Sequence, residues 1–314
     1  MRTVRLRDAV RSFFFRETND FCLTTLRIGL GFVVVAYCLA LRGSWNFLLS
    51  ESAAGLAGRR ISEAFTTMES PWIPKIGWLI AVGKKVGLDE QIVLQVVWVC
   101  LLIAAIFLIA GLFCRSAAIT CWFLHLAATK SGGLVSYGFD DFLTIGLFYL
   151  MLSPMPDRHS LDARLWKTSA PNPALLGLLR RVLQLHLCLI YFFGGLTKAL
   201  GSGWWNGENL WRALTRPPFA VIAPEAIARW AAFLPVLGIC IWLLELSYPI
   251  LIWPARTRLL WLGLICLMHL GIGFGMGMHL FAAVMIVLNL AAFGPALVTA
   301  REERAVALAI VTPG

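Results

Sequence analysis

Long apolar runs place the strongest constraint on what this chain can fold into. Residues 91–113 read QIVLQVVWVCLLIAAIFLIAGLF and contain no charged residue. A helical run of this length crosses the hydrocarbon core of a bilayer, which is about 30 Å thick. The whole chain of 314 residues is 59% hydrophobic and 14% charged, whereas soluble domains carry about 25% charged residues. We therefore predict an all-α fold, a polytopic transmembrane helical bundle.

The apolar runs and the basic residues between them predict one topology. Five arginines within residues 1–20 place the N-terminus in the cytoplasm, because basic residues are retained on that side. About eight spans would then return the C-terminus to the same side. We expect a cytoplasmic amphipathic lead-in over 1–20, a membrane domain over 21–299 and a short cytoplasmic tail over 300–314. The expected spans are 21–42, 91–113, 116–130, 141–153, 176–200, 231–253 and two more within 259–299.

Charge and cysteine usage exclude several classes of function. The net charge of +10 would suggest nucleic-acid binding in a soluble chain, but here the basic residues stand at the ends of apolar runs, so none is predicted. The eight cysteines are single and form no CxxC pair, which favours buried thiols over disulfides or zinc. We expect no metal site. No cleavable signal peptide is expected, since the first apolar run is long enough to span the bilayer.

The segment 43–90 contains no run long enough to span the membrane. We interpret it as an external loop with interfacial helices around 60–66 and 72–84. It carries five basic residues, although long loops carry little weight in assigning topology from charge.

Lys198 follows the apolar stretch LIYFFGGLT and precedes Trp204 and Trp205. In one interpretation its side chain extends to the membrane interface beside a belt formed by the two tryptophans. In the other, the amine is held away from water and acts as a base. Arg27 lies one to two turns inside the first span and also has two interpretations. Its side chain either extends to the cytoplasmic headgroups or pairs with an acidic residue within the bundle.

Two further stretches interrupt the apolar pattern. Residues 129–141, TKSGGLVSYGFDD, place glycines and two aspartates between spans. Asp140 and Asp141 either cap the following helix or face a cavity in which one of them contacts Lys198. The run from His269 to His279 holds four alternating glycines. These glycines indicate close helix packing, or a tight turn that presents two imidazoles to a ligand.

Most of these polar groups fall toward the external side in the predicted topology. Turns between spans three and four, five and six, and seven and eight would then line one outward-facing cavity. The candidate catalytic residues are Lys198, Asp140, Asp141 and His269. The candidate substrate-binding or cofactor-binding residues are Tyr191, Trp204, Trp205, Lys130, Tyr137, His279 and Arg27.

The sequence resembles the membrane domain of the vitamin K-dependent gamma-carboxylases and the wider HTTM superfamily. The segment with Tyr191, Phe192, Gly195, Lys198, Trp205 and Gly207 is similar to the lysine-bearing segment of that domain. TTLRIGLGF resembles its arginine-bearing first helix, and His269 with Phe281 resembles its histidine helix. The stretches 137–140 and 159–162 are similar to its middle helix and the serine-x-aspartate turn. The resemblance extends from about residue 18 to 297.

This resemblance implies a lysine, Lys198, that deprotonates a reduced quinone of the vitamin K type at an external site. Two departures limit the implied activity. Thr197 stands where the animal enzyme has a preceding lysine, and the large soluble domain that holds the propeptide is not expected in this chain. Glutamate carboxylation is therefore left open, and the product is a modified peptide or small molecule.

A second resemblance is to bacterial membrane proteins that help to mature a sporulation-delaying peptide toxin. It implies an accessory factor in a bacterial cytoplasmic membrane, with an exported peptide and a partner maturation protein. In that hypothesis Lys198 forms a structural ion pair. A transporter would predict inverted repeats with broken helices at matching positions, and the sequence has only the single break at 129–141.

Overall fold

The structure, a computed structural model, describes residues 2–51, 58–133 and 135–294. Every regular element in these residues is a helix, as predicted. The chain forms two compact units, residues 1–22 with 173–314 and residues 23–172, and each is described by itself. The expected tail at 300–314 and the last residues of the eighth expected span, 295–299, lie outside the described residues.

Five helical segments are long and apolar enough to cross a membrane. They are α2 (Phe21–Leu41), α6 (Glu90–Ala110), α10 (Pro173–Leu200), the segment Ala231–Leu251, which joins a 3₁₀ turn (Ala231–Phe233) to α14 (Leu234–Leu251), and α15 (Ala255–Met276). Such helices satisfy all of their backbone hydrogen bonds internally, which hydrocarbon requires. These five segments are the mark of an integral membrane protein.

The other three expected spans are also helices, but they are shorter or less apolar. They are α7 (Cys114–Ser131), α8 (Gly138–Leu152) and α16 (His279–Phe293). Both α8 and α16 have 15 residues, which corresponds to about 22 Å of helix.

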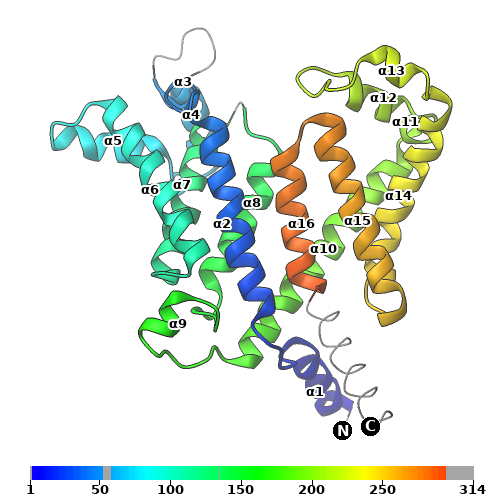
Figure 1. The fold of residues 1–314 in the computed structure, drawn as a ribbon, viewed down its shortest axis with the longest axis horizontal. Helices are drawn as coiled ribbons and strands as arrows, with labels where there is room; N and C mark the ends of the chain where they lie inside the picture. Colours follow the sequence, from blue (N-terminus) through cyan, green and yellow to red (C-terminus); the bar gives the residue numbers. More distant parts are fainter. Residues whose placement is uncertain (1, 52–57, 134, 295–314) are drawn as a thin grey trace, which may run out of the picture. The chain divides into compact units, whose positions relative to one another are not determined.

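In the unit of residues 23–172, α6, α7 and α8 run side by side in alternating directions (Figure 1). The segment between α2 and α6 holds α3 (Trp45–Leu49), α4 (Arg59–Glu69) and α5 (Ile76–Lys85). The last two lie where the interfacial helices were expected. A short helix, α9 (Leu161–Leu165), follows α8.

Arg27 lies on α2 and is enclosed by protein at one end of this unit. Its side chain is 1% exposed and pairs with Asp157, which is 0% exposed, at a distance of 2.5 Å from Nε to Oδ2. Its Nη1 also donates to the carbonyl oxygens of Leu108 and Ile109 at the end of α6. Thr24 donates a further hydrogen bond to Asp157. The partner is an acid from the loop after α8, and Arg27 does not extend to headgroups.

The serine-x-aspartate turn at 160–162 completes this end of the unit. Ser160 caps α9 by accepting the Ala163 N–H at 3.1 Å. The Asp162 carboxylate accepts the backbone N–H groups of Phe113 and Cys114 at 2.8 and 2.7 Å. It thereby satisfies two of the free donors at the N-terminus of α7.

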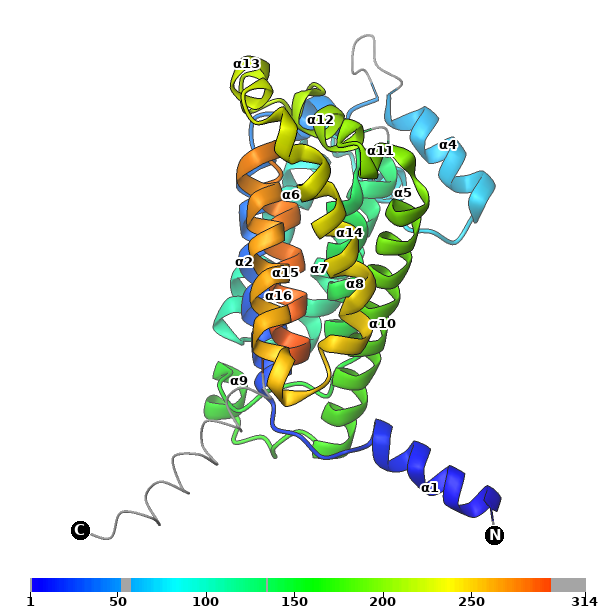
Figure 2. The same ribbon diagram turned by 90° about the vertical axis from the view of Figure 1, so that its right-hand side faces the viewer.

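In the other unit, α10, α14, α15 and α16 run side by side (Figure 2). Its N-terminal helix is α1 (Arg2–Phe14). The segment 201–229, between the expected spans 176–200 and 231–253, folds into three short helices: α11 (Ser202–Trp205), α12 (Glu208–Thr215) and α13 (Pro224–Ala228). Leu210 of α12 and Ile227 of α13 are buried against Leu234 of α14, and this burial holds the segment in place.

The Gly194–Gly195 pair allows α10 and α14 to approach closely. A Cβ atom on Gly195 would lie 2.6 Å from the backbone nitrogen of Leu246. Small residues at helix crossings give this kind of packing in membranes. The close approach brings the middle of α14 beside the last turns of α10.

Replacement of Arg27 with Met should destabilise the protein by about 3–5 kcal/mol, because Asp157 would be left buried without its partner. The matched control is Arg42→Met, at an exposed arginine just beyond the end of α2. The measurement is the free energy of unfolding in mixed detergent. Equal, small effects of both substitutions would contradict a structural role for the Arg27–Asp157 pair.

Gly195→Ala should destabilise by about 1–3 kcal/mol, the usual effect of overpacking, because its methyl group meets the backbone of α14. Gly263→Ala on α15 is the control, since a Cβ there has no neighbour within 4 Å. Both are compared in the same unfolding measurement. A neutral Gly195→Ala would show that α10 and α14 are not in close contact.

Candidate functional site

The two oppositely charged side chains Lys198 and Glu245 form an ion pair between α10 and α14. The distance from Lys198 Nζ to Glu245 Oε2 is 2.5 Å. The lysine side chain is 23% exposed and the glutamate 9%. A charged pair within apolar helices is costly unless each member has a partner, and such groups are commonly functional.

The Lys198 side chain turns back along its own helix instead of extending past its end. Its Nζ lies 3.4 Å from the Gly194 carbonyl oxygen, one turn earlier in α10. The Trp204 ring centre lies 5.4 Å from the ammonium nitrogen, within the range of a cation–π interaction. Glu245 and the Gly194 carbonyl hold the ammonium beside α10 and α14, and its position relative to the membrane interface stays a prediction.

Glu245 is the residue that sequence reasoning missed as the partner of Lys198. The expected partner was Asp140 or Asp141, and both belong to the other compact unit. A signal was present in the sequence. Glu245 is the only acidic residue in the apolar runs 176–200, 231–253 and 259–293, and a charged lysine in this set of helices requires a carboxylate.

Four polar side chains, one each from α10, α14, α15 and α16, form a hydrogen-bonded network. Tyr248 donates to Asn289 Oδ1 at 2.7 Å, and Asn289 Nδ2 donates to the Tyr191 hydroxyl at 2.7 Å. The Tyr191 hydroxyl lies 2.8 Å from His269 Nε2. Tyr191 precedes Lys198 by seven positions on α10 and Tyr248 follows Glu245 by three on α14, so the two tyrosines lie one to two turns from the ion pair on the same helices.

Counting donors in this network assigns the His269 tautomer. If Tyr191 donates to Nε2, only the Nδ1–H of His269 lacks a partner. If His269 donates from Nε2, both Nδ1 and the Tyr191 proton are unsatisfied among the described residues. The first arrangement leaves fewer unpaired groups and is the favoured one. His269 is 3% exposed and its Nδ1 has no hydrogen-bond partner in the described structure.

The two histidines of the glycine-rich run have different surroundings. His269 lies inside α15 and is buried, whereas His279 begins α16 and is exposed. The run is not one tight turn, because α15 continues to Met276 and only Gly277, with φ +69°, has left-handed backbone. A Cβ on Gly273 would lie 3.0 Å from Ala282 of α16, so this glycine serves close helix packing.

A second polar site lies in the unit of residues 23–172. It is a cavity of about 260 Å³ that Lys130, Asp140 and Asp141 line together with residues of α4. Three of the candidate residues near the turn between α7 and α8 thus line the same cavity. Because Lys198 and the tryptophans belong to the other unit, the single cavity expected from three turns stays a prediction.

Asp140 stabilises the start of α8. Its carboxylate accepts the backbone N–H of Tyr137 at 2.9 Å, and it lies 3.8 Å from His125 Nε2. Asp141 is exposed at the cavity. Burial, and after it the nearby Asp140, raises the pKa of Tyr137 to about 12, so its phenol is neutral at physiological pH. The interrupted segment is shorter than expected, since only residues 132–137 separate α7 from α8.

Trp205 and Trp204 cover the end of α10 near the ion pair. Trp205 Nε1 donates to the Ala199 carbonyl oxygen at 2.8 Å, and its ring lies 4.9 Å from that of Trp242. Among the described residues, no three His, Cys, Asp or Glu side chains are grouped so that they could hold a metal ion.

Comparisons of the chain with protein-family models, with curated proteins and with solved structures find no match. The argument for function therefore depends on the geometry of the Lys198–Glu245 pair and its neighbours.

Tyr191→Phe should destabilise by about 1–3 kcal/mol, because Asn289 and His269 both lose a buried partner. Tyr248→Phe removes only the hydrogen bond to Asn289 Oδ1 and should cost about 1 kcal/mol. The free energies of unfolding of the two variants provide the comparison. If Tyr248→Phe were the more harmful substitution, Tyr191 would not be the link between Asn289 and His269.

Proposed function

We propose that this chain is an integral membrane enzyme in which the Lys198–Glu245 pair is the acid–base centre. The pair acts on a reduced quinone to modify a peptide or small molecule. The observation that carries the proposal is the 2.5 Å contact between an amine and a carboxylate within apolar helices, with the lysine still 23% exposed. The amine is thus within reach of a ligand and next to a group that can take its proton.

Proton transfer within the pair supplies the base. Water is scarce at this depth, so the charged pair and the neutral pair differ less in free energy than they do in water. Transfer of a proton from Lys198 Nζ to Glu245 Oε2 leaves a neutral amine with a free electron pair. That amine can accept a proton from an acidic hydroxyl group held beside it.

The side chains around the pair fit an aromatic ring bearing hydroxyl groups. Trp204 supplies a flat apolar surface beside the Lys198 ammonium, and Lys198 and Glu245 supply a donor and an acceptor. When bound, a reduced quinone would supply the acidic hydroxyl group whose proton the Lys198 amine accepts. Tyr191, His269 and their hydrogen-bonded network lie one to two turns further along the same helices and hold α10, α14, α15 and α16 in register.

The proposal also includes a membrane topology. The eight helices α2, α6, α7, α8, α10, α14, α15 and α16 are the eight spans, with both termini in the cytoplasm of a bacterial cell. Arg115, Arg158 and Lys167 cluster at the cytoplasmic end of one unit, and Arg256 and Arg258 mark that side in the other, in line with the distribution of positive charge in membrane proteins. The ion pair, at the opposite end of α10, then faces outside.

A second candidate function is an accessory maturation factor for an exported peptide, with a partner protein and no chemistry of its own. A specific observation favours it. The Lys198 ammonium already has Glu245 and the Gly194 carbonyl as partners, which is the arrangement of a structural ion pair.

A double substitution separates the two candidates. Single variants such as Lys198→Met leave one buried charge and are expected to unfold, at a cost of about 3–5 kcal/mol. Lys198→Met with Glu245→Met removes both charges and should stay folded, since replacing a buried pair with apolar residues is often neutral. The control is Glu208→Gln with Arg212→Gln, which removes an exposed ion pair on α12.

The measurement is the binding of a short-chain menaquinol to the full chain in nanodiscs. For the enzyme we expect the folded double variant to bind at least about tenfold more weakly than the control, a loss of about 1.4 kcal/mol. If the double variant is folded and binds like the control, Lys198 is structural, and the accessory factor becomes the better description.

A further inference from the structure

The five basic residues of segment 43–90 are not explained by topology or by the proposed chemistry. They are Arg59, Arg60, Lys75, Lys84 and Lys85. Four of them, all except Lys85, line one cavity between α4 and α5 with a volume of about 540 Å³. Sites for small molecules have volumes of about 300–1,000 Å³, so this cavity has room for a ligand.

The two arginines at this cavity are engaged with carboxylates. Arg59 contacts Glu63 at 3.2 Å and Glu90 at 3.3 Å, and it lies 3.8 Å from Glu51. Arg60 contacts Glu51 at 3.0 Å. Glu63 is further fixed because it accepts the Gly77 N–H and the Ser131 hydroxyl at 2.8 and 2.7 Å. These contacts build a rigid wall joining α4 to the start of α5 and the end of α7.

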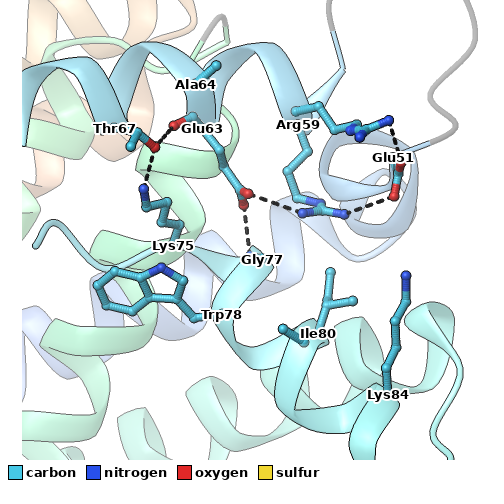
Figure 3. A pocket seen from close by; sticks show the side chains of 12 residues that line it. Glu51, Arg59, Glu63, Ala64, Thr67, Lys75, Gly77, Trp78, Ile80 and Lys84 are labelled. Carbon is cyan, nitrogen blue, oxygen red and sulfur yellow. Dashed lines mark hydrogen bonds and ion pairs between the residues drawn. The ribbon is translucent and has the colours of Figure 1, made fainter. Parts of the chain in front are cut away.

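The two lysines that line the cavity do not pair with a carboxylate of this network. Lys75 is buried, donates to the Thr67 hydroxyl and stands 5.7 Å from the Trp78 ring centre. Lys84 has no ion-pair partner in the part of the chain that the structure describes. Figure 3 shows its side chain rising from α5 toward the Arg59–Glu51 contact, with no interaction drawn to its nitrogen. A cavity with two ammonium groups unpaired with any carboxylate selects an anion.

The surroundings of the cavity indicate where that anion comes from. At the end of α4 and in the following turn, Met68 and Trp72 are 83% and 85% exposed. Val82 on α5 is also exposed. Helices that combine basic residues with exposed aromatic and aliphatic side chains lie at membrane surfaces, and tryptophans concentrate at the level of the headgroups. A soluble acidic peptide would leave these apolar side chains in water.

We propose that the α4–α5 cavity binds the phosphate of an anionic phospholipid headgroup, with Lys84 as its cationic contact. The exposed apolar side chains of α4 and α5 enter the acyl boundary beside it. This site lies in the unit of residues 23–172, and it does not depend on the proposed chemistry at Lys198.

The test is titration calorimetry on the full chain in a neutral detergent, at fixed salt. The ligands are short-chain phosphatidylglycerol, short-chain phosphatidylcholine, inorganic phosphate and a hexaglutamate peptide. We expect phosphatidylglycerol to bind about tenfold more tightly than phosphatidylcholine. Lys84→Gln should weaken phosphatidylglycerol binding about fivefold, the usual effect of one basic residue at an anionic membrane surface.

Lys85→Gln is the matched control, because Lys85 is the exposed neighbour of Lys84 on the same helix and does not line the cavity. We expect it to change the affinity less than twofold. Lys84→Glu provides a second variant with a larger expected loss, and because Lys84 is exposed neither substitution should impair folding. If Lys84→Gln and Lys85→Gln weaken phosphatidylglycerol binding equally, the proposal is overturned. The lipid would then be attracted by the positive charge of the surface as a whole and not by the cavity.

The other ligands identify a different source of the anion. If inorganic phosphate binds as tightly as phosphatidylglycerol, and loses affinity with Lys84→Gln, the ligand is free phosphate and the lipid proposal fails. Preferential binding of the hexaglutamate peptide would equally overturn it and would indicate an acidic protein segment. Equal affinity for phosphatidylglycerol and phosphatidylcholine would show that the cavity does not select charge.

Discussion

Ionised side chains inside apolar helices need partners, and this requirement organises both compact units. Hydrocarbon offers no water to solvate a guanidinium or an ammonium group, so each must find a carboxylate or carbonyl oxygen within the protein. Arg27 meets the requirement with Asp157 and the end of α6. Lys198 meets it with Glu245 and the Gly194 carbonyl. In each unit the pair ties together segments far apart in the sequence.

The two pairs satisfy the same requirement but have different accessibility, and this difference separates structure from candidate function. Arg27 and Asp157 are almost completely enclosed, and every contact described for them joins them to protein groups. Lys198 is 23% exposed, and its cation lies beside an aromatic ring. A fully enclosed pair can only hold elements together. A partly open pair can also exchange a proton with a bound molecule, which is why the chemistry is proposed at Lys198.

The fold was largely predictable from the sequence because apolar run length alone determines it. All eight runs are helices, and two interfacial helices lie near their expected positions at α4 and α5. Helix ends were less predictable. Residues 271–276 remain helical in spite of their alternating glycines. In apolar surroundings their backbone N–H and C=O groups have no water to bind, so they form hydrogen bonds within the helix. The segment 201–229 forms short helices, and Leu210 and Ile227 on two of them are buried against Leu234 of α14, a long-range contact.

Some residues of the candidate site could be recognised in the sequence, but their contacts could not. Lys198, Tyr191 and His269 were recognised by their type and position, yet Glu245 and Asn289 complete their interactions from other helices. The backbones of α10 and α14 come close at Gly195, where a Cβ atom would lie 2.6 Å from the Leu246 nitrogen and 3.1 Å from the Glu245 carbonyl carbon. Glu245 is therefore held beside the last turns of α10, where Lys198 stands. The ion pair depends on helix packing at a residue that carries no functional group.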